Sequence, residues 1–292
     1  MGLRKESVFL LMQEGLRKPF HGKIVTLGKQ DVWATFEEIE RLGKEHNYPI
    51  QPVAKIELSE KTELREQGFI SDRTLFKLLG FKEIVSLDAS KYENADLLYD
   101  LNLDCLPPEL KEAFDVVLDP GTIEHVFHVP NSLKNIFNLL QIGGRVIHIS
   151  PSSNHIDHGF YMFSPTLFSD YYTANRFDLQ PLKIIRYKPQ SVYPWGIATY
   201  SPGEFNSFSF GGLDDAMYAV CCIAGKNDHS TSNQIPQQHN FIQNLWKQKE
   251  FSFGNSKIKS WVKSSPLFYK FCLPLLRFYK RANLRRKFKS LV

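Results

Sequence analysis

Glycine and carboxylate side chains stand at or near the ends of four short apolar runs in this chain. Gly28 and Asp88 follow two of these runs directly, Asp100 lies near the end of a third, and DPGT (119–122) closes the fourth. In a nucleoside-binding sheet, a carboxylate after the second strand accepts both ribose hydroxyls, and a polar group after the third reaches an adenine edge. Singly, Asp88 or Asp100 is more often a turn former or a helix cap. Together, each after its own apolar run, they favour a nucleoside pocket.

A second group of reactive side chains lies in the segment NHIDHGFYMF (154–163), which contains His155, Asp157, His158 and Tyr161. Histidine changes protonation near neutral pH, so His158 is our candidate general base, with Asp157 or His155 orienting it or holding substrate. The alternative is that these histidines only satisfy backbone groups of a loop. Three ligand-type residues within four positions also suggest a metal site, but the sequence offers no supporting cluster elsewhere, so we predict none.

The elements that must position these residues are buried strands alternating with helices. Continuous apolar runs of this length are typical of strands buried on both faces. A strand, helix, strand rhythm gives a right-handed crossover and an open, mainly parallel sheet, which binds ligands at the carboxyl ends of its strands. The predicted strands are 23–27, 83–87, 96–101, 114–119 and 145–150, followed by 181–187 and 217–225.

Three helices can be placed from their end signals. One begins at VPNS (129–132) and is expected to stop at Gly143 and Gly144. Another begins at Ser164, which is followed by a proline at the first helical position. The third, DRTLFKLLG (72–80), is expected to pack before the second strand.

The chain divides into three predicted parts. Residues 1–228 form the α/β domain, in which the excess length between the first two strands marks 34–70 as an insertion of helix and loop. Polar, aperiodic residues make 229–240 a linker, and 241–292 form a basic tail.

The central part of the sequence resembles a known family. FDVVLDPGTIEHVFHVPNSLKNIFNLLQIGGRVIHISP (114–151) is similar to the fourth-strand, helix and fifth-strand region of class I S-adenosylmethionine-dependent methyltransferases. SLDAS (86–90) and ADLLYDLN (95–102) fall where that family has its second- and third-strand cofactor motifs, so the resemblance reaches from about residue 22 to 225. It implies a Rossmann-like, mostly parallel sheet of seven strands with helices on both faces and an antiparallel last strand at 217–225.

The resemblance also implies a cofactor, S-adenosyl-L-methionine, lying across the strand ends. Gly28 would approach its methionine part, Asp88 its ribose and Asp100 its adenine side, while Asp119 and Gly121 would line the methyl-donor end. Within the same motif His125 is expected to be structural, and His148, inside a strand, is expected to be a satisfied core residue.

The first loop departs from the family pattern. The family usually has an acidic residue and several glycines there, whereas this chain has Thr26 and only Gly28 before Lys29, Gln30 and Asp31. Because S-adenosylmethionine carries no phosphate, a glycine nest is less necessary than in a nucleotide site. The altered loop nevertheless motivates an alternative, a catalytically inactive methyltransferase-like binding or scaffold protein. A nicotinamide enzyme is disfavoured because no GxGxxG follows any strand.

Charge is distributed unevenly along the chain. The net charge is +5, yet residues 247–292 hold 13 Lys and Arg against one acidic residue, so the remainder is net acidic. If the tail is helical, its apolar and basic residues fall on different faces, which suits an anionic membrane interface rather than a span. Nucleic acid is the rival partner, and packing on the core or on a second subunit is a third alternative.

The remaining signals concern location and acceptor. The four cysteines show neither metal-ligand spacing nor a disulfide framework, and the N-terminal apolar run is too short for a signal peptide, so we expect a cytoplasmic protein. We therefore predict a methyltransferase that modifies a hydroxyl of a small molecule such as a glycan, lipid-linked sugar or related metabolite at the cytoplasmic membrane face. Only the basic tail favours that acceptor class.

Overall fold

The apolar runs of the sequence pair into one twisted sheet. A computed structural model describes residues 2–188, 195–208, 211–239, 278–279 and 281–291 of the chain. Within these residues the main sheet has ten strands, of which β8 (Asp178–Leu179) pairs with β11 beside the main path. The path runs in the order β12 (Lys289–Ser290), β10 (Gly196–Tyr200), β9 (Leu182–Tyr187), β11 (Met217–Gly225), β7 (Leu140–Ser153), β6 (Phe114–Asp119), β2 (Lys23–Leu27), β4 (Glu83–Asp88) and β5 (Leu97–Leu98).

The pairing directions confirm the predicted sheet. Strand β2 is parallel to both β4 and β6, and the parallel pairs β4–β5 and β6–β7 continue the sheet on either side. Strand β11 is antiparallel to both of its main neighbours, β7 and β9. The chain order therefore reverses between β2 and β6, and the loops that leave these two strands diverge at that point. Strands β8, β10 and β12 extend the sheet beyond the seven predicted strands.

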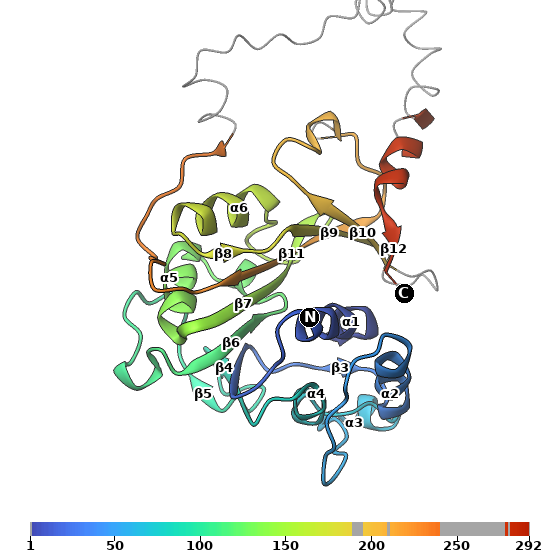
Figure 1. Ribbon diagram of the computed structural model, residues 1–292, viewed down its shortest axis with the longest axis vertical. Helices are drawn as coiled ribbons and strands as arrows, with labels where there is room; N and C mark the ends of the chain where they lie inside the picture. Colours follow the sequence, from blue (N-terminus) through green and yellow to red (C-terminus); the bar gives the residue numbers. More distant parts are fainter. Residues whose placement is uncertain (1, 189–194, 209–210, 240–277, 280, 292) are drawn as a thin grey trace, which may run out of the picture.

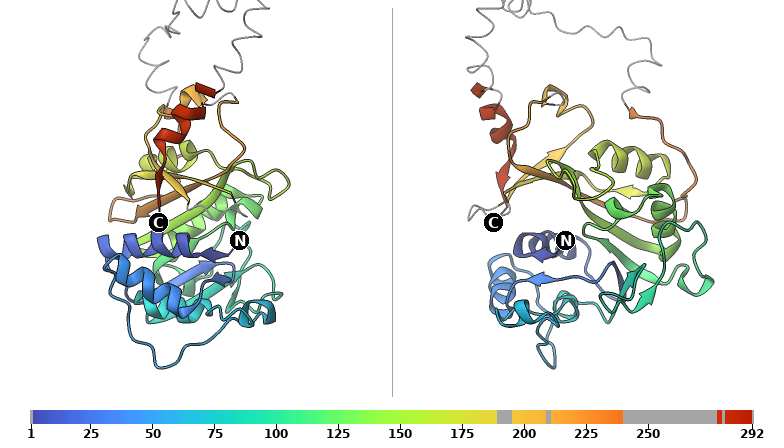
Figure 2. Two further views of the ribbon diagram at one scale, coloured as in Figure 1. Left: turned by 90° about the vertical axis from the view of Figure 1, so that its right-hand side faces the viewer. Right: turned by 180° about the vertical axis from the view of Figure 1, so that it is seen from behind.

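Helices cover both faces of this sheet, as predicted (Figures 1 and 2). Because side chains alternate along a strand, Val25 of β2 lies in one hydrophobic core and its neighbour Ile24 in the other. The first core includes apolar residues of α5 (Val129–Leu139) and α6 (Pro165–Ala174). The second includes those of α1 (Lys5–Arg17), α2 (Phe36–Glu45) and α4 (Asp72–Leu79). Apolar contact on both faces explains why the strands read as continuous apolar runs.

The helix end signals are confirmed with one correction. Ser71 caps α4 by accepting from the backbone N–H of Thr74, and Gly80 ends the helix in the left-handed region with φ 112°. The Ser164 hydroxyl likewise accepts from the N–H of Thr166 at the start of α6. Helix α5 instead ends at Leu139, before the predicted glycine stop, because Leu140 is already extended and pairs with Phe114 of β6.

The predicted insertion contains two helices. Thr35 and Glu38 form a reciprocal capping box at the start of α2, and α3 (Thr62–Arg65) follows a long irregular stretch. Just before the insertion, β3 (Val32–Trp33) pairs with β1 (Leu3–Arg4) in a small parallel sheet, which fixes the N-terminus beside the first loop. Three short 3-10 helices complete the regular structure of the described residues: η1 (Pro108–Leu110), η2 (Ile123–His125) and η3 (Asn206–Phe208).

The segment after β11 and the described C-terminal residues both lie against the domain. Lys226 is buried, and its ammonium group donates to the carbonyl of Leu140 at 2.7 Å. At the C-terminus a helical turn over 281–287 buries Leu284 completely, and β12 then pairs with β10. The backbone N–H of Leu291 donates to the carbonyl of Trp195 at 2.8 Å. The rest of the predicted tail, residues 241–277, 280 and 292, lies outside the described residues, and its membrane role stays a prediction.

Within the part of the chain that the structure describes, no helix combines the length and apolar character needed to cross a bilayer.

Helix α1, which the sequence did not predict, is fixed to the sheet by a buried ion pair. The Glu14 carboxylate lies 2.6 Å from Nε of Arg145 on β7, and both side chains are almost fully buried. Arg145 also donates from its guanidinium to the carbonyl of Lys18 at 2.6 Å. Removing one member of a buried pair leaves an uncompensated charge in the core, which is more costly than losing the attraction itself.

We expect Glu14→Leu to lower the free energy of unfolding by about 3 to 5 kcal/mol, because Arg145 would remain buried without its partner. Chemical denaturation followed by circular dichroism measures the change. Glu45→Leu, at an exposed position at the end of α2, is the matched control and should leave the midpoint nearly unchanged. Equal losses for the two variants would contradict a stabilising role for the pair.

Candidate functional site

A cavity of about 320 Å³ opens at the carboxyl ends of the central strands, where the chain order reverses. Four of the five predicted cofactor residues line it: Gly28, Asp88, Asp100 and Gly121. They come from the loops after β2, β4, β5 and β6, which the sequence separates widely. The sheet therefore brings together the strand-end residues that the sequence singled out.

Gly28 lines the cavity at the end of β2, where it adds no side chain. Its backbone is in the left-handed region with φ 73°, and its N–H donates to the carbonyl of Leu87 at 2.7 Å. A Cβ atom placed on Gly28 would lie 3.3 Å from Oγ1 of Thr122 and 3.9 Å from Oδ2 of Asp88. A side chain at this position would be strained and would project among the lining residues. The turn after β2 therefore favours glycine at position 28, because other residues rarely adopt this positive φ.

The two carboxylates that line the cavity also stabilise their own turns. Oδ1 of Asp88 accepts from the N–H of Ser90 at 2.8 Å. Oδ1 of Asp100 accepts from the backbone and side-chain nitrogens of Asn102, at 2.9 and 2.8 Å. In each case the Oδ2 atom accepts no hydrogen bond from the described residues. The turn-forming and ligand-binding interpretations are thus compatible, because one oxygen serves the turn and the other is left for a donor in the cavity.

The unusual residues of the first loop bind the insertion. The Lys29 ammonium pairs with Glu60, and Asp31 pairs with Lys61 at 2.8 Å. Gln30 donates from Nε2 to the carbonyl of Gly28 at 3.0 Å, while its buried Oε1 has no partner in the described structure. Lys29 and Gln30 also line a second cavity of about 580 Å³ on the insertion side. The positive charge of Lys29, which could repel a sulfonium group, is therefore paired with Glu60.

Asp119 is corrected from a cavity-lining residue to a buried structural one. It is fully buried and is not among the residues that line the cavity. Oδ1 accepts from the N–H of Thr122 at 2.9 Å, and Oδ2 lies 2.6 Å from Nδ1 of His148. The other ring nitrogen of His148 lies 2.6 Å from the Tyr172 hydroxyl. His148 is a satisfied core residue, as expected, and this chain of bonds turns Asp119 away from the cavity and into the core.

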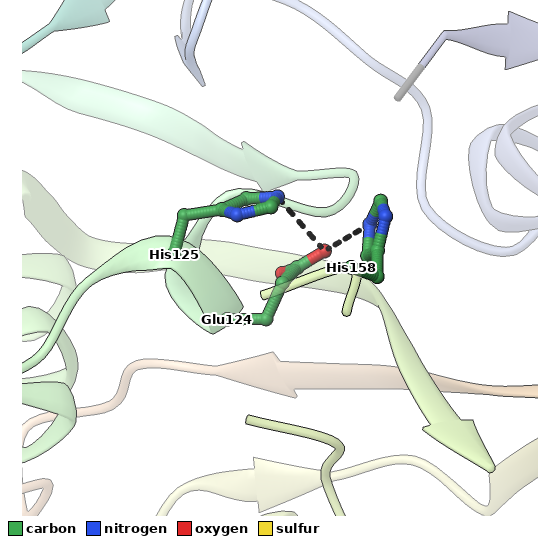
Figure 3. A group of neighbouring side chains, drawn as sticks. All are labelled: Glu124, His125 and His158. Carbon is green, nitrogen blue, oxygen red and sulfur yellow. Dashed lines mark ion pairs between the residues drawn. The ribbon is translucent and has the colours of Figure 1, made fainter. Parts of the chain in front are cut away.

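Glu124, His125 and His158 form a cluster beside the cavity (Figure 3). Glu124 and His125 belong to η2 after β6, and His158 comes from the loop after β7. Oε1 of Glu124 lies 3.6 Å from Nε2 of His158 and 4.0 Å from Nε2 of His125. His125 also lines the cavity. The sequence assigned His125 a structural role. In the structure its side chain is 46% exposed and lies beside the carboxyl group of Glu124.

Burial shifts the protonation of this cluster. Desolvation, with a smaller contribution from Asp119, raises the pKa of Glu124 to about 8. Desolvation also lowers the pKa of His125, His155 and His158, so these imidazoles are neutral at neutral pH. A neutral imidazole can accept a proton or act as a ligand.

The other predicted catalytic residues surround His158 in different environments. His155 is buried, and its Nε2 lies 3.4 Å from the Tyr187 hydroxyl. Asp157 is exposed, with its backbone in the left-handed region at φ 63°. The Tyr161 hydroxyl donates to the carbonyl of Phe127 at 2.8 Å, which ties the loop after β7 to the loop after β6. Their catalytic roles stay predictions. Sequence reasoning missed Glu124, for which the EH pair was the available signal.

Comparison with known proteins gives structural likenesses only. No family model matches the chain, and no curated protein matches it. Among solved structures, a methyltransferase from Archaeoglobus fulgidus aligns at 12% identity and a TM-score of 0.38, covering 76% of this chain and 94% of the other. The YcgJ protein from Bacillus subtilis aligns at 10% identity and a TM-score of 0.38, with 76% and 98% covered. A geranyl diphosphate methyltransferase aligns at 12% identity and a TM-score of 0.38, with 76% and 85% covered.

The strand order described above decides the fold. Seven strands in the order β5-β4-β2-β6-β7-β11-β9, with β11 antiparallel, form the sheet that the sequence resemblance implied. The chain has a class I methyltransferase fold. This fold places the cavity at the strand ends, where the loops after β2 and β6 diverge.

The buried Asp119–His148–Tyr172 chain predicts a stability effect. Tyr172→Phe removes the hydroxyl that meets His148 and leaves a buried ring nitrogen without a partner, which should cost about 1 to 3 kcal/mol of unfolding free energy. Thermal and denaturant unfolding measure it. Tyr92→Phe, at a position 91% exposed, is the matched control and should behave like the wild type. If Tyr172→Phe also does so, the chain of bonds does not stabilise the fold.

Proposed function

We propose that this protein is an S-adenosylmethionine-dependent methyltransferase that modifies a hydroxyl group. The observation that carries the proposal is the joint placement of Gly28, Asp88, Asp100 and Gly121 around one cavity at the strand ends. The fold and the sequence resemblance support the same cofactor.

The residues around the cavity fit the proposed cofactor chemically. The Oδ2 atom of Asp88 is available to accept from ribose hydroxyls, and Asp100 is available at the adenine side. Since Lys29 is paired with Glu60, the loop presents no free ammonium to a sulfonium. The glycine-poor first loop therefore retains the features that a cofactor without phosphate requires.

S-adenosylmethionine supplies an already activated methyl group, so the protein mainly has to align the acceptor and remove its proton. The histidines beside Gly121 are suited to the second task, because burial keeps them neutral. His158 is the proposed proton acceptor, with His155, Asp157 and Tyr161 around it holding the loop or the substrate. The apolar and aromatic residues around this loop would shield the acceptor from water.

We propose as acceptor class a glycan, a lipid-linked sugar or a related metabolite at the cytoplasmic membrane face. The support is the basic charge of residues 247–292, which would favour an anionic surface by about 1 kcal/mol for each Lys or Arg near it. The protein would then be peripheral, with its catalytic domain beside the headgroups.

Asp88→Ala tests the ribose role. Losing the charged acceptor of two hydroxyls should weaken S-adenosylmethionine about 10- to 100-fold, because hydrogen bonds to charged groups contribute about 1.5 to 3 kcal/mol. Isothermal titration of the full chain measures it. Asp104→Ala, at an exposed position outside the cavity lining, is the matched control and should bind like the wild type. Unchanged affinity of Asp88→Ala would refute the assignment.

The same titration separates the enzyme from the inactive alternative. Wild-type protein that shows no heat of binding at millimolar cofactor would favour a methyltransferase-like binding or scaffold protein with an altered first loop.

The membrane proposal is tested without removing the C-terminal strand. Because Leu284 and β12 pack on the domain, deleting 241–292 would also disturb the sheet, so charge removal is the cleaner change. Replacing with Gln the six Lys between 247 and 270 should abolish co-sedimentation with anionic vesicles. The control replaces six exposed Lys of the domain: Lys44, Lys55, Lys77, Lys82, Lys91 and Lys111. Equal pelleting of the two variants would count against the tail.

A further inference from the structure

A buried carboxylate without a hydrogen-bond partner lies between two histidines beside the cavity. The Glu124 side chain is fully buried, and within the described residues neither of its oxygens accepts a hydrogen bond. Buried carboxyl groups in native proteins are normally hydrogen-bonded, paired or bound to a metal, because burying polar atoms without a partner is costly. His125 and His158 lie beside this carboxyl group, but neither imidazole is within hydrogen-bond distance of it.

We propose that Glu124, His125 and His158 bind a divalent first-row transition metal ion. Each residue offers one ligand atom, and these three atoms all lie within 4.8 Å of one another. One carboxylate and two imidazoles form a donor set typical of ions such as Zn²⁺, Co²⁺ or Fe²⁺ in sites that keep open coordination positions. Mg²⁺ and Ca²⁺ prefer oxygen ligands and suit this set less well.

The spacing needs only small side-chain movements to close around an ion. Zinc–ligand distances of about 2.0 to 2.2 Å place neighbouring ligand atoms roughly 3 to 3.5 Å apart. The observed separations from Glu124 Oε1, 3.6 Å and 4.0 Å, are slightly longer. The side chains of His125 and His158 are 46% and 35% exposed, so neither ring is enclosed by the core. Figure 3 shows the two rings on either side of the Glu124 carboxyl group.

The loop that carries His158 is docked against the other two residues. A Cβ atom on Gly159 would lie 2.9 Å from the carbonyl oxygen of Glu124 and 3.1 Å from Nδ1 of His125, so glycine permits this close approach. The N–H of Tyr161 donates to the same Glu124 carbonyl at 3.2 Å. The backbone thus holds His158 opposite Glu124 without any contribution from the side chains that would bind the ion.

The position of this site suggests its use. His125 lines the cavity together with Gly121, so an open coordination position would lie close to the methyl-donor end. An acceptor hydroxyl bound to the ion would have a lowered pKa and could release its proton to solvent water, so His158 would then act as a ligand rather than as a free base. This use rests on the proposed methyltransferase function, whereas binding of the ion does not.

Titration of the tag-free, chelator-treated full chain with Co²⁺, followed by visible absorption, tests the site. Co²⁺ is the preferred probe because a nitrogen and oxygen donor set gives ligand-field bands without a thiolate charge-transfer band. That distinction excludes binding at the exposed thiol of Cys105. We expect one such ion per chain, displaced by Zn²⁺.

Two variants and a matched control locate the ion. Glu124→Gln and His158→Gln should each weaken binding at least about tenfold. His128→Gln, at an exposed histidine that precedes α5 and lies outside the cluster, should bind like the wild type. Since His158 is partly exposed, its variant should fold even if Glu124→Gln does not, and circular dichroism checks both.

Absence of the nitrogen and oxygen spectrum in the wild type, or equal Co²⁺ affinity of His158→Gln and the wild type, would overturn the proposal. Because no cofactor is present in this titration, its failure is independent of the calorimetric test with S-adenosylmethionine. If the chain binds S-adenosylmethionine but not Co²⁺, the metal proposal is wrong and His158 remains the proposed proton acceptor.

Discussion

The cavity depends on a hydrogen bond between the loop after β6 and the last residue of β2. The Thr122 hydroxyl donates to the carbonyl of Leu27 at 2.6 Å, connecting the loop after β6 to the end of β2. These strands are neighbours in the sheet, but their loops lead in opposite directions, so a gap opens between them. The bond connects the two sides of that gap. Gly28, in its left-handed conformation, places no side chain in it. The other cavity residues are arranged around this junction.

Asp119, the last residue of β6, and Glu124, in the following η2, are two buried carboxyl groups with different surroundings. Asp119 is held in the core by His148 and by backbone N–H groups, so both of its carboxylate oxygens have hydrogen-bond partners. Glu124, only a short distance along the chain, is equally buried but has no hydrogen-bond partner in the described structure. The first carboxylate therefore stabilises the fold, and the second is the one with unused bonding capacity. That contrast is why Glu124, rather than Asp119, is the residue around which the proposed chemistry is centred.

The insertion explains how an atypical first loop can remain ordered. In a glycine-rich loop the backbone itself surrounds the ligand, whereas here side chains determine the path of the chain. Lys29 and Asp31 pair with Glu60 and Lys61 from the insertion, and Gln30 bonds back to the loop carbonyls. Lys29 and Gln30 line both the strand-end cavity and the larger cavity on the insertion side. The departures from the family pattern are thus matched by partners elsewhere in this chain.

The sequence by itself determined the positions of seven strands, the bounds of α4, the starts of α5 and α6, and the strand-end positions of Gly28, Asp88, Asp100 and Gly121. Those features depend on apolar periodicity, caps and turns, all of which are encoded within a few neighbouring residues. Local signals also misplaced the end of α5, because pairing of Leu140 with Phe114 overrode the glycine stop. They could not show that Asp119 faces the core or that His158 meets Glu124. Only the tertiary structure decided these two points, since they depend on which strands become neighbours and on how closely the loop at Gly159 approaches η2.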